Sequence, residues 1–411
     1  MSSLPEPATA EAVTPTAFQS SRLVGAAAIS ALGDGLLVTA LPLLAASLTK
    51  DPLLITGVYV AGRIPWAFSP FIGALVDRVG RPRRTMVLAD LFRAIVLIVI
   101  AIAVARGAGL VMLYPAAFLL EAAQIGFATS SWSLVRHVTA DAHLDKVNSR
   151  LSAAQTSGEQ LAGPLLGSVV FGWGRAVPLV GDAISFVLSA LLLAGLREPP
   201  ANRQPKKVMQ IVREGMRVVR NTPTVLVPTA WVACIALAHS MQVSGLVLLK
   251  EQFELTERAF GGFIALIAAG NVLGALVAPR LISWLTPHVA MSLATLISGL
   301  AHIVAGSLGE PFFVAAALGV DGVVVVVGSI TGVGLRQRNA PKELVGSVMA
   351  TTRMAIYGAG IPGGIIGGLI TKATSATTTL IVAGIMMTVT SLVGTRLLRA
   401  ALRSQKIAAL A

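Results

Sequence analysis

The segment GALVDRVGRPRR, residues 73–84, carries five charged side chains in a chain of which only 12% of the residues are charged. Roughly two hundred residues later, the segment GALVAPRL, residues 274–281, repeats its first four letters but has Ala278 where the first copy has Asp77. The repeat indicates an internal duplication. The charge that only one copy carries indicates that the two copies have different roles.

Three further pairs of segments match in the same order and at nearly the same offset. They place Asp34 opposite His239 and Glu121 opposite Asp321, and a proline near the middle of a helix follows the last pair in both halves. This order predicts a parallel duplication of a six-helix unit. The matching segments are SALGDGLL (30–37) with IALAHSMQ (235–242), LLEAAQIG (119–126) with GVDGVVVV (319–326), and LDKVNSRLSAAQT (144–156) with KELVGSVMATTR (342–353).

The composition is that of an integral membrane protein, because 55% of the 411 residues are hydrophobic and the mean hydropathy is +0.79. A helix needs about 20 apolar residues to cross the hydrocarbon core. We therefore predict an all-α membrane protein of about twelve transmembrane helices in two pseudo-symmetric six-helix bundles. The predicted spans are 22–48, 52–76, 85–105, 108–133, 149–171, 176–196, 225–249, 259–279, 286–308, 311–334, 346–370 and 375–398.

The chain divides into five predicted parts. Between the bundles, VMQIVREGMRVVRNTP has apolar residues at helical spacing and three arginines, which predicts an amphipathic helix on the cytoplasmic leaflet. The parts are a disordered cytoplasmic tail (1–21), a first bundle (22–196), a cytoplasmic linker with the amphipathic helix (197–224), a second bundle (225–398) and a cytoplasmic tail (399–411).

The net charge of +13 is read as a topology signal, because the lysines and arginines fall in alternate loops. This pattern predicts that both termini are cytoplasmic and gives no reason to expect a nucleic-acid partner. The abundance of Ala, Gly and Arg suits a GC-rich bacterial genome, so we expect the plasma membrane of a bacterium.

Enzymatic chemistry is not expected. Cys234 is the single cysteine, which excludes an intramolecular disulfide and a Cys-rich metal site. The phosphate-binding loop, the His-Glu-x-x-His motif and the Gly-x-Ser-x-Gly motif are all absent from the sequence. We therefore expect no catalytic residue, no metal and no cofactor. The expected partners of the chain, taken as a monomer, are membrane lipids, a small-molecule substrate and protons.

The charged segment resembles the cytoplasmic signature Gly-x-Leu-x-Asp-Arg-x-Gly-Arg of the major facilitator superfamily. Other segments, such as GRIPW (62–66) and REGMRVV (213–219), resemble the branch that holds the enterobactin exporter and macrolide-efflux proteins. The resemblance implies alternating access and a conformational latch on the N-terminus of helix 11, formed only while the cytoplasmic side is closed. The alternative is that the arginines only set topology. The implied latch residues are Gly73, Asp77, Arg78, Gly80, Arg81 and Arg84.

Ionisable residues at the depth of the bilayer centre are costly, at about 2.5–3.5 kcal/mol each by the lower estimates. Burial favours the neutral form of a carboxyl group, whereas a nearby cation favours its charged form. The resemblance places Asp34, Glu121, His239 and Asp321 on the helices that line the central cavity. The residues proposed for proton coupling and the cavity are Asp34, Arg63, Glu121, Glu159, His239 and Asp321.

Within this set, Asp34 and Glu121 are expected to carry the proton, with Arg63 as the modulating cation and His239 and Asp321 nearer the substrate. The alternative is a static pair between Asp34 and Arg63. Outside the set, Asp90 and Arg93 are expected to form a structural pair near the inner end of helix 3. His302 is expected to be structural, and Asp182 is given no role.

Helix 5 contains GEQLAGPLLGS (158–168), which resembles the Gly-Pro signature of proton-driven drug exporters. Proline frees a backbone carbonyl and bends a helix, so Gly163, Pro164 and Gly167 are predicted to form a hinge. Glu159 and Ser168 stand where the signature has glycines, and the arginine that those exporters carry in helix 4 is absent.

The function favoured by these features is proton-coupled export of bulky amphipathic compounds, such as antibiotics or siderophores. Its support is the branch resemblance and a cavity expected to be poor in aromatic residues. The alternatives are an uptake symporter for a small nutrient and, less favoured, a membrane scaffold that does not transport.

Overall fold

The computed structural model describes residues 17–139, 143–198, 208–341 and 344–408. These segments are helical throughout their regular structure and contain no strand. The first sixteen residues of the predicted N-terminal tail lie outside the described part. Residues 17–21, predicted as part of that tail, are instead the first turn of a helix.

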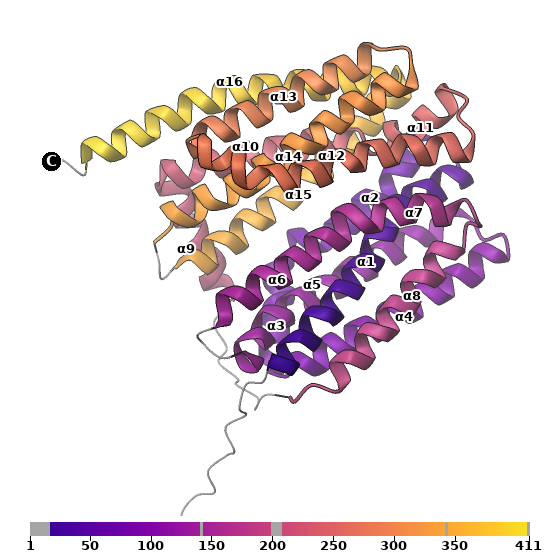
Figure 1. The fold of residues 1–411 in the computed structure, drawn as a ribbon, viewed down its shortest axis with the longest axis horizontal. Helices are drawn as coiled ribbons and strands as arrows, with labels where there is room; N and C mark the ends of the chain where they lie inside the picture. The colour runs from indigo at the N-terminus through magenta and orange to yellow at the C-terminus, as the bar shows by residue number, and fades with distance from the viewer. Residues whose placement is uncertain (1–16, 140–142, 199–207, 342–343, 409–411) are drawn as a thin grey trace, which may run out of the picture.

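The first half of the chain forms one helical bundle, coloured indigo to magenta in Figure 1. Its spans run alternately up and down between the two ends of the molecule, with α2 and α3 forming one span and α6, η3 and α7 another (Figure 1). Their bounds are α1 Ala17–Leu48, α2 Pro52–Ala67, α3 Ser69–Val79, α4 Pro82–Ala105, η1 Leu110–Met112, α5 Leu113–Val138, α6 Leu144–Ser157, η3 Gly158–Ala162, α7 Gly163–Phe171 and α8 Val177–Ala194.

The second half forms a bundle of its own, coloured orange to yellow, beside the first (Figure 1). The predicted amphipathic helix is α9, and it precedes this bundle in the chain. The bounds are α9 Val208–Asn221, α10 Pro223–Met241, α11 Val243–Gln252, α12 Glu257–Trp284, α13 Pro287–Ser307, α14 Pro311–Asn339, α15 Val345–Ala373 and α16 Ala376–Ala408.

Ten helices of the described chain are long and apolar enough to cross a membrane. Two predicted spans are made instead by broken helices, namely α2 with α3, and α6 with η3 and α7. Prolines account for both breaks because they supply no N–H to the helix: Pro65 and Pro70 flank the break at Phe68, and Pro164 follows the widened turn of η3. The predicted twelve-span architecture is therefore confirmed.

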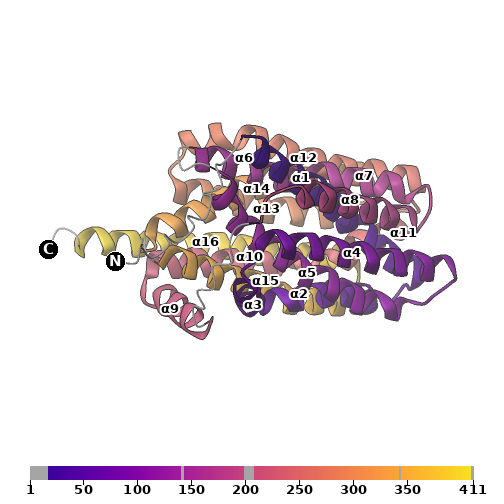
Figure 2. The same ribbon diagram turned by 90° about the horizontal axis from the view of Figure 1, so that it is seen from below.

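The molecule has two different ends. The end that we call the basic end holds the start of α1, the end of α16, helix α9 and the arginine-rich turn before α4 (Figure 2). The other, which we call the opposite end, holds the short connections at 49–51, 253–256 and 374–375.

The two halves meet mainly toward the opposite end, where α15 packs along α2. Glycines permit this approach: a Cβ atom on Gly364 would lie 3.0 Å from side-chain carbons of both Thr56 and Val60. A second stripe on α15 faces its own half, since a Cβ on Gly367 would overlap the carbonyl oxygen of Met241 in α10. Small residues allow close helix packing in membranes, so α15 packs closely against both halves, on α2 of the first and α10 of the second.

Candidate functional site

A buried arginine organises the interior of the first half. Arg93, in the middle of α4, is 0% exposed, and its guanidinium donates to Asp34 at 3.0 Å, to Gln124 at 2.7 Å and to Asp90 in a short contact. The ring of Phe186 lies 3.9 Å from the guanidinium carbon. The Asp90–Arg93 pair predicted from the sequence is present. The prediction that this pair lies near the end of the helix is wrong, because Arg93 is at mid-helix. Arg93 also binds Asp34, the acid for which a pair with Arg63 was the alternative.

More acids surround this arginine than it can neutralise. Glu159 accepts a hydrogen bond at 3.4 Å from Gln124, and the buried Asp182 accepts one at 2.9 Å from Ser185. Asp182 also lies directly against α1, where a Cβ on Gly33 would overlap its carboxylate. Asp182, which was given no role, therefore belongs to the cluster.

The charges of the first-half interior do not balance. Five acids and two arginines lie in the interior around Arg93 and at the contact with the second half, which leaves an excess of three negative charges in this group when all are ionised. The other charged residues of these helices lie nearer the helix ends and are not counted. Uncompensated charge is costly in a membrane, so full ionisation of all five acids is unfavourable in this interior. The acids are Asp34, Asp90, Glu121, Glu159 and Asp182, and the arginines are Arg63 and Arg93.

Glu121 and Arg63 lie where the two halves touch. Trp66 of α2 donates its indole N–H to Glu121 at 2.6 Å and stacks on Tyr357 of α15, with ring centroids 4.4 Å apart. The Arg63 guanidinium carbon lies 4.7 Å from the centroid of Tyr59 and 5.2 Å from that of Tyr357. Aromatic faces attract cations at such distances.

Two of the three tyrosines of the chain therefore lie against Arg63, and Trp66 stacks on one of them, contrary to the expected aromatic-poor cavity. The ion pairs of the described residues do not include Arg63. The static pair with Asp34 is thus wrong for this conformation. The hydroxyls of Tyr59 and Ser240, 2.8 Å apart, add a further link between the halves.

The interior of the second half is built around one acid. Asp321 of α14 accepts a short hydrogen bond from Ser298, and its other oxygen lies 3.2 Å from Nε2 of His239 in α10. His302 of α13, which is 0% exposed, has its Nδ1 3.9 Å from Asp321 and its Nε2 3.0 Å from the side-chain oxygen of Gln242. His302, predicted to be structural, is therefore part of this polar cluster.

The same three residues are the described group whose donor atoms could hold a metal ion. These atoms of His239, His302 and Asp321 lie within 4.8 Å of one another. However, both ring nitrogens of His302 lie at hydrogen-bond distance from oxygen atoms, those of Ser298 and Gln242. A metal would have to displace these bonds, so the geometry fits a hydrogen-bonded cluster better than a metal centre.

The helix predicted to hinge is irregular at the expected place. Gly158–Ala162 forms a π-helical turn directly before Gly163 and Pro164, and the N–H of Gly163 donates to the Gly158 carbonyl. Such turns are frequent at functional sites. The turn packs on α1, because a Cβ on Gly35 would overlap the Gly158 carbonyl. Asp34, next to Gly35 in α1, and Glu159, within the π-helical turn, therefore lie next to the contact between the two segments.

Two ion pairs join the halves at the opposite end. Lys50 lies 3.3 Å from Glu251 of α11, and Asp51 lies 2.5 Å from Lys372 of α15. The hydrogen bond from Lys372 holds the pKa of Asp51 below its usual range. Neither pair is among the residues predicted from the sequence, although the adjacent opposite charges of Lys50 and Asp51 are a visible signal.

The predicted latch residues lie at the basic end. Helix α3, which carries three of them, contacts α15 and α9, so the two halves also touch at this end. The atom nearest to a Cβ on Gly73 would be in Thr129 of α5, at 3.7 Å. Gly80, with φ of 61°, ends α3 in a left-handed cap, which favours glycine. Arg84 lies 3.9 Å from Glu198 of its own half. Arg78 and Arg81 are exposed, and the side chain of Asp77 lies outside the described part.

Among curated proteins, the chain is similar to the putative bacilysin exporter BacE of Bacillus subtilis (strain 168). The two are 22% identical over 202 residues, which are 48% of this chain and 50% of that protein, so the match spans about half of the relative's length.

Two solved structures show the same fold. The POT family transporter PepTSo superposes with a TM-score of 0.75 at 14% identity, covering 94% of this chain and 98% of that one. The nucleoside transporter NupG superposes with a TM-score of 0.71 at 14% identity, covering 92% and 98%.

A match to a family model agrees with this fold of two six-helix bundles. The family model of the Major Facilitator Superfamily matches residues 23–364, and the chain belongs to this family of membrane transporters.

Proposed function

We propose that the chain is a proton-coupled exporter of bulky amphipathic compounds, such as antibiotics or siderophores, working by alternating access. The observation that carries the proposal is the excess of three acids over arginines in the buried and half-buried interior of the first half, next to the contact with the second half. A proton is the smallest cation that removes such an excess. Export is supported by the similarity to a putative exporter.

Glu121 and Glu159 are the acids best placed to exchange the proton. Asp34 is held by Arg93 within its own half, so a rigid rotation of one half against the other leaves that pair intact. Glu121 instead receives its hydrogen bond from Trp66, which stacks on Tyr357 of the other half. Glu159 lies in the π-helical turn, and this turn contacts α12 of the second half. Rocking therefore changes the surroundings of both glutamates.

The direction of opening follows from where the halves are joined. By the positive-inside rule we place the basic end, with both termini, in the cytoplasm of a bacterium. The ion pairs of Lys50 and Asp51 then close the outer side. The latch is proposed to be loose in this state, because a Cβ on Gly73 would lie nearest to Thr129 of its own half. The two bundles, 22–196 and 225–398, are proposed to move as units about this closed end, with bending at Gly163, Pro164 and Gly167.

A second candidate is proton-coupled uptake of a small polar nutrient. The observation that favours it is the group of Tyr59, Trp66 and Tyr357 around Arg63, because aromatic faces stack on flat or ring-shaped substrates. Export remains the first proposal, since the interior amide side chains are few.

The test is accumulation of a fluorescent cationic dye and of a macrolide in pump-deficient cells, with and without an uncoupler. Wild type is compared with Glu121→Gln, Glu159→Gln and Asp34→Asn. The matched control is Glu310→Gln, an exposed acid at the opposite end. We expect wild type and the control to lower accumulation in an uncoupler-sensitive manner, and Glu121→Gln to abolish this while reaching the membrane.

Retained, uncoupler-sensitive efflux in both glutamate variants would overturn the assignment of the proton to these residues. Unchanged accumulation in wild type would overturn export of such compounds. In that case, uptake of labelled nucleosides and peptides by the same cells tests the second candidate.

A further inference from the structure

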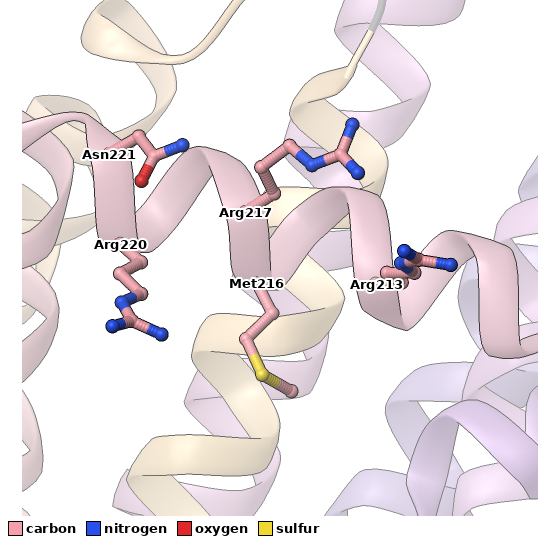
Figure 3. A pocket seen from close by; sticks show the side chains of 5 residues that line it. All are labelled: Arg213, Met216, Arg217, Arg220 and Asn221. Atoms are coloured by element: carbon pink, nitrogen blue, oxygen red, sulfur yellow. The ribbon is translucent and has the colours of Figure 1, made fainter.

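Helix α9 is the one described helix of the linker between the halves, and it lies at the basic end, across the direction of the spanning helices (Figures 2 and 3). It contacts α15 and α10 of the second half and α3 of the first. None of the roles proposed above uses it.

One face of α9 is fixed to the second bundle. Val212, Gly215 and Val219 are buried, and a Cβ on Gly215 would overlap the Ser347 carbonyl and the Thr351 hydroxyl. Val219 joins Val225 and Val348 in a small apolar cluster. Because the backbone itself is in contact here, α9 is held close to α15 with its orientation set.

The other face of α9 presents arginines with methionines between them. Met209 is 63% exposed and Met216 is 48% exposed, and Arg213, Arg217 and Arg220 are all exposed. Four of these residues line a hollow of about 390 Å³, namely Arg213, Met216, Arg217 and Arg220, together with Asn221 (Figure 3). None of the three arginines forms an ion pair with another described residue.

We propose that this face of α9 binds the headgroup of an anionic phospholipid. The guanidinium groups match the two oxygens of a phosphate, which arginine bonds in a forked arrangement. Basic segments beside a spanning helix attract anionic lipid at about 1 kcal/mol per charge near the surface. The exposed methionines decide between a lipid and a soluble anion, because acyl chains bury them and a free phosphate does not.

The test uses the purified full-length chain in detergent micelles and counts bound lipids by native mass spectrometry. Dioleoyl phosphatidylglycerol is compared with dioleoyl phosphatidylcholine, which has the same acyl chains without net charge. The variant is Arg213→Gln with Arg217→Gln and Arg220→Gln. The matched control is Arg396→Gln with Arg399→Gln and Arg403→Gln, which removes the same charge from exposed positions on α16 at the same end.

We expect wild type to prefer phosphatidylglycerol, and the α9 variant to lose roughly 100-fold in affinity for it, from three charges at the above free energy each. The α16 control should change by less than threefold. Met216→Gln should weaken lipid binding without removing charge, and inorganic phosphate at 10 mM should not displace the lipid.

Equal binding of the two lipids, or equal losses in the two triple variants, would overturn the proposal. Displacement of the lipid by inorganic phosphate, with no effect of Met216→Gln, would show a site for a soluble anion instead. The melting temperature of each variant in phosphatidylcholine micelles shows whether it is folded. If the α9 triple variant is not folded, the effect of Met216→Gln on lipid binding tests the proposal instead.

Discussion

The two halves of this duplicated chain keep the same helices but differ in what they bury. The first half holds five acids and two arginines in its interior, whereas the polar cluster of the second holds one acid, Asp321, with two histidines and a serine. Asp321 can be neutralised within its cluster by one histidine proton. The five acids of the first-half interior outnumber its two arginines, so full ionisation would leave excess negative charge in that half alone.

The same difference extends to the backbone. Pro164 and Pro362 occupy corresponding places in the two halves, yet the first follows a π-helical turn and the second lies inside the unbroken helix α15. Glycines line α15 where it meets α2 and α10, so α15 packs closely against both helices. The duplicated helix is therefore interrupted in the first half and continuous in the second.

The largest expected effect comes from removing the central cation of the first half. Arg93→Met leaves Asp34 and Asp90 without their partner, and removing one member of a buried pair costs about 3–5 kcal/mol. The matching change in the second half, His239→Asn, leaves Asp321 bonded to Ser298 and near His302, and should cost about 1–2 kcal/mol, the usual scale of one lost hydrogen bond.

The free energy of unfolding of both variants, measured by denaturant titration in detergent, checks this difference. The thermal unfolding of His302→Asn serves as a control for the second cluster. Equal losses from Arg93→Met and His239→Asn would show that the two interiors are electrostatically alike, and would remove the basis for placing proton binding in the first half.

A second comparison concerns the two ends of the molecule. A Cβ on Gly367 would overlap the Met241 carbonyl, whereas the atom nearest to a Cβ on Gly73 would be 3.7 Å away. Overpacking typically costs about 1–3 kcal/mol. We expect Gly367→Ala to lower the free energy of unfolding by this amount and Gly73→Ala to leave it nearly unchanged. Equal losses in the same titration would contradict the open contact at the basic end.

The sequence predicted the helices well because hydropathy and length decide whether a segment spans a membrane. The predicted span 286–308 and the observed α13, Pro287–Ser307, differ by one residue at each end. The interruption at Phe68 arises because Pro65 and Pro70 lack the backbone N–H groups that a continuous helix needs. A hydropathy profile does not contain this information. Prolines were therefore the signal for the breaks.

The site was only partly predictable, because sequence gives the depth of a residue but not the neighbour that its side chain faces. The repeat marked His239 and Asp321 as residues of the cavity helices, and they are in contact. Arg93 was placed near a helix end because its helix was expected to start at 85. The helix begins at Pro82 and extends to Ala105, so Arg93 lies at mid-helix, facing Asp34.

The smallest expected effect concerns the ion pair between Asp51 and Lys372. Exposed ion pairs contribute about 0–1 kcal/mol. The Asp51–Lys372 pair therefore favours the closed arrangement of the halves at the opposite end only slightly. The pKa of Asp51 is lowered chiefly by the hydrogen bond from Lys372. The contact is therefore complete above the ordinary pKa of aspartate, about 3.9, and is lost as the pH falls through the lowered value.

Spin labels at Gly109 and Gly309, in a Cys234→Ser background, report this separation, since a side chain at either position would meet no atom within 4 Å. We expect one short distance between pH 7 and about 4, and a longer component below. Asp51→Asn should show part of the longer component at every pH and no transition of its own. A pH response that persists in Asp51→Asn would assign it to another group, and the Lys50–Glu251 pair is then tested by Glu251→Gln, because it is the remaining described ion pair between the halves at this end.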